Sequence, residues 1–272
     1  MATQTATLAR PISPASAGLL LPAFTLWWRE IVRFYRQPGR VVGVLASPLV
    51  FWAVLGSGFG TSFSSGGSTG YLAYSYPGIL ILIVLFTSIF AMMSVIEDRK
   101  EGFLLSVLVA PVPRTAIVLG KVLGGTTLAA LQGLIFLVFA PFAGVHLNPE
   151  QVLLTAVVVF LVSFSLTALG FAIAWPMDSA QAFHGIVNLF LIPMWLVSGA
   201  MFPISGASGW IRVVMRLNPL TYGVEALRDL LYPGRETDFT LTHSIATLLL
   251  FSLVMFVVAL LIANRRSTRP AA

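Results

Sequence analysis

The 272-residue chain is 57% hydrophobic and only 10% charged, with a mean hydropathy of +0.92, which excludes a water-soluble domain and predicts an all-α membrane protein. Its net charge of +6 does not indicate nucleic acid binding, because basic residues beside apolar spans are what membrane topology requires. The absence of cysteine excludes a disulfide framework and a thiolate metal site.

The first predicted element is an amphipathic helix over residues 22–38, in an interface segment of residues 22–40 that follows a flexible cytoplasmic N-terminus at 1–21. Apolar residues recur there at helical spacing and include Trp27 and Trp28, whereas Arg29, Arg33 and Arg36 take the other face. Such a helix lies in the membrane interface, held by apolar burial and by anionic lipid headgroups. A plain anchor and a docking surface for a partner both fit this pattern.

Six stretches are long and apolar enough to cross a bilayer, which takes about 20 residues. They lie at residues 41–60, 76–95, 117–143, 151–175, 184–203 and 243–263, within a transmembrane domain over residues 41–264 that precedes a basic cytoplasmic tail at 265–272. Six spans place both termini on one side of the membrane. Of the 16 Lys and Arg residues, only four then lie on the other side: Arg212, Arg216, Arg228 and Arg235. The positive-inside rule therefore predicts cytoplasmic termini in the cell's inner membrane.

A compact protrusion is predicted between the second and third spans. The charged run Glu97-Asp98-Arg99-Lys100-Glu101-Gly102 leads into a short apolar stretch from Phe103 to Ala110, which two prolines terminate just before Arg114. A protrusion of this kind fits the groove of a partner, and it fits a solvated helix end equally well. The third span then opens with Gly120 and Gly124, a G-x-x-x-G spacing that allows close helix packing.

Two short helices are predicted on the outer side, between the fifth and sixth spans. One lies around Trp210 to Met215, and the second begins at Asn218-Pro219, an N-cap followed by Pro at the first helical position. Glu225 and Arg228 are three residues apart and are predicted to pair on the polar side of this second helix. Both helices are too short to span alone and fit a re-entrant pair, either as a structural lid or as a gate.

The sequence also bears on the source of energy. With Lys121 counted at the cytoplasmic end of the third span, the interiors of the spans contain no Asp, Glu, Lys or Arg. Carriers that are driven by ion gradients usually have such groups within their spans. The phosphate-binding pattern G-x-x-x-x-G-K-[ST] is absent, because Gly120-Lys121 is followed by Val122, so a separate chain would have to bind ATP. The three histidines are too scattered for a metal site. An ion-coupled carrier and a non-transporting membrane anchor remain the alternatives.

Three groups of residues resemble the ABC-2 type permeases, most closely the drug-resistance and nodulation-factor exporters. They are Tyr76-Pro77-Gly78, the charged run at 97–102 with Ala110-Pro111-Val112-Pro113-Arg114, and Asn218-Pro219-Leu220-Thr221-Tyr222 with Glu225-Ala226-Leu227-Arg228. The family often has Thr-Leu-Glu after the glycine of the charged run, where this chain has Phe103-Leu104-Leu105.

The resemblance implies an interface helix at about 22–38, a coupling helix at about 97–110 and outer re-entrant helices at about 205–232. It also implies two copies of this chain with two nucleotide-binding subunits, which would hold the ATP and Mg²⁺. Closure of those subunits would open a path at the dimer seam for an amphipathic or lipid-linked cargo. Residues 97–103 and Arg114 would then couple the chain to the ATPase, while Asn218, Pro219, Tyr222, Glu225 and Arg228 would belong to the outer gate.

Overall fold

The computed structural model describes residues 18–36, 70–145, 147–234 and 237–265, together with scattered residues between 39 and 58. Within these ranges the regular structure is helical, with no strand, as the all-α prediction requires. Most of the predicted flexible N-terminus and of the basic tail lies outside the described residues.

Among the residues that the structure describes, five stretches are long and apolar enough to cross a membrane, so the chain is a multi-pass membrane protein. They are α3 (Tyr71–Ala91) continued by α4 (Met93–Lys100), α6 (Arg114–Phe136) continued by η1 (Leu137–Ala143), α7 (Pro149–Ala174), α8 (Ala180–Trp195) continued by η2 (Leu196–Ala200), and α11 (Leu241–Asn264). They coincide with five of the predicted spans. The structure describes the predicted first span at 41–60 only in separate short runs, the longest at 49–54, so the count of six stays a prediction.

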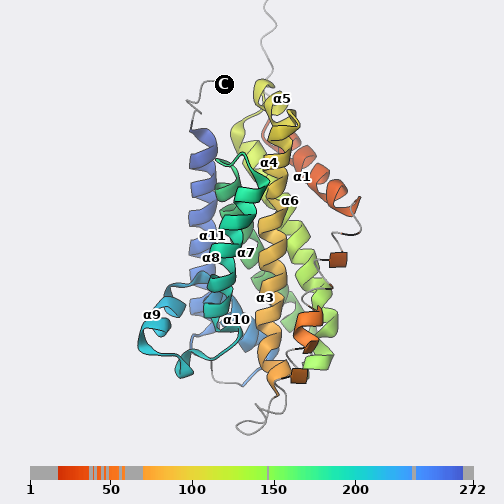
Figure 1. The fold of residues 1–272 in the computed structure, drawn as a ribbon. Coiled ribbons are helices and arrows are strands. Elements are labelled where there is room, and N and C mark those ends of the chain that lie inside the picture. Colours follow the sequence, from red (N-terminus) through yellow and green to blue (C-terminus); the bar gives the residue numbers. More distant parts are fainter. Residues whose placement is uncertain are drawn as a thin grey trace, which may run out of the picture.

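The bundle has two different ends (Figure 1). At one end lie α1 (Leu20–Tyr35), α4 and α5 (Phe103–Val109), and α11 also finishes there. At the other end lie α9 (Gly209–Leu217) and α10 (Pro219–Leu231). We call these the α5 end and the α9 end. Because α1 lies at the α5 end and α3 begins at the α9 end, the predicted first span is expected to cross between them.

The central helix of the bundle is α3. Its residues from Ile79 to Leu85 are buried on every side, against α6, α7 and α10, as expected of a helix that is apolar all round. Lipid tails are as apolar as leucine, so close packing and buried polar contacts hold such helices together. One contact joins α3 to the end of α6, where the Tyr76 hydroxyl donates to the Phe136 carbonyl at 2.9 Å and the two rings stack.

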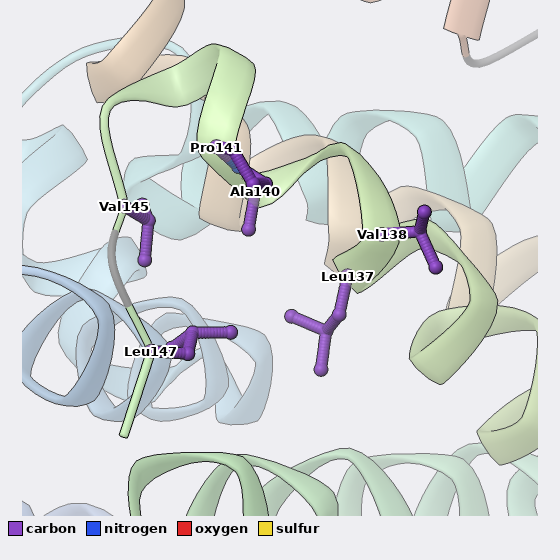
Figure 2. A pocket seen from close by; sticks show the side chains of 6 residues that line it. All are labelled: Leu137, Val138, Ala140, Pro141, Val145 and Leu147. Carbon is purple, nitrogen blue, oxygen red and sulfur yellow. The ribbon is translucent and has the colours of Figure 1, made fainter. Parts of the chain in front are cut away.

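A cavity of about 340 Å³ lies beside η1, which continues α6 toward the α9 end (Figure 2). The side chains that line it are all apolar and belong to Leu137, Val138, Ala140, Pro141, Val145 and Leu147. The predicted site residues lie elsewhere, at the two ends of the bundle.

Candidate functional site

The segment predicted as one coupling helix at 97–110 consists of two helices with a turn between them. α4 ends at Lys100 and α5 begins at Phe103. Between them Gly102 has a φ of +77°, a left-handed conformation that glycine adopts without the steric penalty of a side chain. The turn makes α5 a separate projection at the α5 end of the bundle.

The G-x-x-x-G spacing of α6 receives α1 of the same chain. A Cβ at Gly120 would lie 2.7 Å from the Ala23 carbonyl oxygen, and one at Gly124 would lie 2.7 Å from the Glu30 Cβ. These two glycines therefore let the backbones of α1 and α6 approach closely. The indole of Trp27 adds a hydrogen bond, donating to the Thr127 hydroxyl at 3.0 Å.

A buried lysine lies where these helices meet α4. Lys121 donates to Glu30 at 2.6 Å, to the Ser94 hydroxyl at 3.2 Å and also to Asp98. The exposed fractions of Lys121, Glu30 and Asp98 are 1%, 4% and 0%. Lys121 is thus about two turns inside α6 rather than at its solvated end. The inference that the spans contain no buried ionisable group is therefore wrong.

Two arginines of α1 complete this arrangement. Both terminal nitrogens of Arg29 donate hydrogen bonds to the Asp98 carboxylate, at 2.7 and 2.8 Å. Arg33 donates one hydrogen bond to Asp98 at 2.9 Å and one to Glu97 at 2.7 Å. We call these six residues the ionic cluster: Arg29, Glu30, Arg33, Glu97, Asp98 and Lys121. Its three cations and three anions balance. The hydrogen bonds that Arg29 donates to the Asp98 carboxylate raise the pKa of Arg29 above its ordinary value.

The ionic cluster differs from the predicted contacts of α1, which was expected to lie in the membrane interface with its arginines at the lipid headgroups. Arg29 and Arg33 were expected to face anionic headgroups, but they face the carboxylates of α4, and only Arg36 remains exposed. The physical reason is that carboxylates of the same chain lie within hydrogen-bond reach and compete with lipid phosphates. What α1 exposes is an apolar stripe that includes Leu20, Phe24 and Trp28, while Trp27 is half-buried against α6.

The other predicted coupling arginines also bind within the chain. Arg99 donates to the carbonyls of Trp175 and Met177 and to the Asp178 carboxylate, and so holds the turn between α7 and α8. Arg114 donates to the Ala263 carbonyl at 2.8 Å, at the C-terminal end of α11. A cation at that position also suits the helix dipole.

The remaining exposed residues define a surface on α5. Leu105, Leu108 and Val109 are exposed by 61%, 36% and 88%, an apolar face projecting from the α5 end, with Lys100 and Glu101 exposed beside it. The inner face of α5 is fixed, because Leu104 packs with Leu26 and Ile117. Phe103 lies under Arg29, whose Cζ is 3.7 Å from the ring centroid.

At the α9 end, Asn218 begins α10 as predicted. Its side-chain oxygen accepts from the Leu220 amide at 3.0 Å, and Pro219 follows at the first helical position. The same side chain donates to the carbonyls of Met194 and Val197, where α8 breaks. Tyr222 donates to the Arg216 carbonyl at 2.8 Å and so ties α10 to the end of α9. The structure shows α10 packed against α3, α7 and α11.

The predicted Glu225–Arg228 pair is confirmed, but its place on a polar face is wrong. Glu225 is 1% exposed and Arg228 is 5% exposed. Arg228 also donates to the Gly199 carbonyl at 2.9 Å, and Tyr74 donates to the same oxygen at 3.0 Å. Gly199 has a φ of +82° and lies in the broken end of α8. Burial raises the pKa of Glu225 above that of an ordinary glutamate.

Comparison with known proteins places this architecture in a family. Residues 23–232 match the family model described as ABC-2 type transporter. The chain belongs to the ABC-2 type transporter family. It is similar to the putative transport permease ycf38 of Cyanophora paradoxa, at 27% identity over 76% of this chain and 73% of that protein.

Two further relatives of this ABC-2 chain come from bacteria. The chain is 24% identical to Nodulation protein J of Neorhizobium galegae over 92% of its length and 95% of that protein. It is 25% identical to the daunorubicin resistance ABC transporter permease protein DrrB1 of Streptomyces coeruleorubidus, over 80% of this chain and 78% of that protein. The predicted resemblance is therefore confirmed.

The ionic cluster is the feature of this ABC-2 chain that sequence reasoning missed. The sequence contained one indication of this cluster. Lys121 directly follows Gly120 of the close-packing motif, so a helix that packs on this motif would also cover Lys121. Glu30 lies seven residues after Ala23 and four after Leu26, on the face of α1 that becomes buried. A buried lysine requires a carboxylate partner, and Glu30 was available to provide it.

Proposed function

We propose that this chain is the membrane subunit of an ATP-driven exporter, and that a separate ATP-binding subunit docks on the exposed apolar face of α5. That subunit would hold the ATP and Mg²⁺, since the phosphate-binding sequence pattern is absent here. Family membership supports the class, and a relative named as a daunorubicin resistance permease supports outward transport. The α5 end then faces the cytoplasm, as the distribution of Lys and Arg predicts.

The observation that carries this proposal is the combination of an exposed tip and a fixed base in α5. Leu105, Leu108 and Val109 are free to bind a partner, whereas Leu104 and Phe103 are packed against α1 and α6. Exposed apolar surface outside a membrane span is typical of a protein-binding site. A push on the tip would therefore pass directly into the membrane helices.

The charged residues at the α5 end would then transmit the movement of α5 to the other helices. The ionic cluster links α4 to α1 and α6, Arg99 links α4 to the turn between α7 and α8, and Arg114 links α6 to the end of α11. Glu97, Asp98 and Arg99 would pass force between helices of this chain, while Lys100 and Glu101 are placed to contact the ATPase. Buried charges with several partners suit this role, because a packed polar network moves between discrete arrangements.

We further propose that two copies of the chain work together in the cell's inner membrane. The path would lie at the seam between the copies and carry an amphipathic or lipid-linked cargo, with Asn218, Pro219, Tyr222, Glu225 and Arg228 at its outer end. Support comes from the family and from the exposed apolar faces of α8 and α11, which fit lipid or a second copy.

The experiment pairs the chain with its ATP-binding subunit in vesicles and measures ATP-dependent transport. Changing Leu105→Asp and Val109→Asp together is expected to abolish copurification with the ATPase and reduce transport at least tenfold, with unchanged thermal stability. Ser205→Asp, on an exposed turn near α9, is the matched control and is expected to keep both. Full transport by the double variant would overturn the docking assignment.

The ion-coupled alternative needs its own test. Ion-driven carriers usually have ionisable groups within their spans, and Lys121 is such a buried group in α6. Dissipating the proton and sodium gradients while ATP remains is expected to leave transport intact. Transport that collapses under these conditions, or that persists without the ATPase, would make the chain a carrier instead.

A further inference from the structure

The helix α9 has an apolar stripe that the described residues leave uncovered. Trp210, Val213, Val214 and Leu217 are exposed by 72%, 58%, 42% and 80%. Their spacing of three, four and seven residues places them on one face of the helix. Scattered exposed apolar residues are ordinary, but a continuous stripe along a helix indicates a partner surface.

The other sides of α9 are already defined. Met215 is fully buried and packs with Ile204 and Ala207 on the protein side. Arg212 donates to the Ala207 carbonyl at 3.1 Å, and Arg216, one turn further along the same edge, is exposed. At about 100° per residue, this cationic edge lies roughly a third of a turn from the centre of the stripe. The helix therefore presents a protein face, an apolar face and a cationic edge.

We propose that α9 lies flat in the membrane interface, with its apolar stripe in the hydrocarbon of the outer leaflet and Arg216 at the lipid phosphates. Nine residues reach only about 14 Å, so the helix cannot cross the bilayer. An amphipathic helix with Trp on its apolar face and Arg at its polar edge has the composition of an interfacial anchor.

The position of α9 supports lipid as the occupant. The stripe follows closely on the spanning stretch formed by α8 and η2, whose exposed residues Leu189, Phe190 and Leu196 need hydrocarbon around them. α9 also stands to one side of the bundle in Figure 1, whereas α10 is packed within it. This arrangement replaces the expected re-entrant pair by one buried helix and one interfacial helix, and it does not depend on how transport is energised.

Spin labelling tests this directly, because the chain has no cysteine and single cysteines report single positions. Trp210→Cys, Val213→Cys and Leu217→Cys would each carry a nitroxide, in protein reconstituted into phosphatidylcholine and phosphatidylglycerol vesicles. Leu250→Cys, exposed on the spanning helix α11, is the hydrocarbon reference, and Ser205→Cys is the water reference. The measurement is the collision rate of each label with oxygen and with a water-soluble nickel complex.

The three stripe positions are expected to match Leu250→Cys, with high access to oxygen and at least fivefold lower access to nickel than Ser205→Cys. Arg216→Cys is expected to be intermediate, at headgroup depth. Nickel access at the stripe equal to that of the water reference would overturn the proposal. Low access to both reagents, with dipolar broadening between labels, would overturn it too and assign the stripe to a second copy of the chain.

Discussion

The two ends of this permease both bury charges, but they assemble them differently. The ionic cluster at the α5 end joins three helices, and its Lys121–Glu30 contact connects residues 91 positions apart. The Glu225–Arg228 pair at the α9 end lies within α10, three positions apart, and reaches other elements through backbone groups such as the Gly199 carbonyl. The first arrangement connects helices to one another, whereas the second holds the broken end of one helix in place.

The difference matters for what happens when one charge is removed. A buried pair that loses a partner leaves an uncompensated charge, which is far more costly than the intact pair is beneficial. A lone carboxyl group can escape this cost by binding a proton. The cations left in the ionic cluster cannot lose their charge as readily, because arginine remains protonated in proteins. We therefore expect the α5 end to be the more sensitive of the two.

The largest effect is expected for Asp98→Asn, because Arg29, Arg33 and Lys121 would all lose their shared anion. The loss should be about 3 to 5 kcal/mol of unfolding free energy, the range for breaking a buried ion pair. Thermal unfolding of the purified protein in detergent measures it. Glu101→Gln is the control, since its side chain is 61% exposed and 3.8 Å from Arg33. Equal stability of the two variants would show that the cluster is not a structural link.

A smaller, pH-dependent effect is expected for Arg228→Met, which leaves Glu225 buried without its cation. The cost should be about 2 to 3 kcal/mol at neutral pH, below that of the ionic cluster, because Glu225 can neutralise itself. Burial already raises the pKa of Glu225, so the folded state binds its proton more tightly than the unfolded state does. The stability that the folded state gains from binding this proton is fully present below the ordinary pKa range of glutamate. It is lost as the pH rises through the raised pKa of Glu225.

Melting temperatures at pH 5 and pH 7.5 separate this explanation from simple loss of packing. Arg228→Met should recover part of its stability at pH 5. The double variant Glu225→Gln with Arg228→Met should show no such recovery, because it has no carboxyl group to protonate. The same pH response in both variants would place the titrating group elsewhere.

How well each region could be predicted from the sequence depends on how far apart in the chain its interacting residues lie. Local sequence patterns predicted the features that depend on residues close together in the chain. These features are five spans, the start of α10 at Asn218 and the Glu225–Arg228 pair. Burial of the pair was not predicted, since spacing on a helix does not reveal what the helix packs against.

The ionic cluster could not be assembled from local patterns. Helical periodicity grouped Arg29 and Arg33 on one face of the predicted helix, and both bind Asp98. A periodic pattern is the same, however, whether that face meets lipid phosphates or carboxylates of the chain. The carboxylates of Glu97 and Asp98 on α4 lie 64 to 69 residues away from Arg33 and Arg29, which bind them. Only the folded arrangement of α1, α4 and α6 brings them together.

The smallest of these effects is expected at the α1–α6 crossing, where shape rather than charge determines how α1 packs. Gly120→Ala would place a methyl group 2.7 Å from the Ala23 carbonyl oxygen and the Leu26 Cβ, and overpacking of this kind costs about 1 to 3 kcal/mol. Gly185→Ala on α8 is the control, since its Cβ would meet no atom within 4 Å. Unfolding in detergent measures both, and protease digestion reports release of α1. If Gly120→Ala releases α1 while the charges remain, the ionic cluster depends on close backbone contact to form. If α1 stays protected, the charges alone are sufficient to hold it.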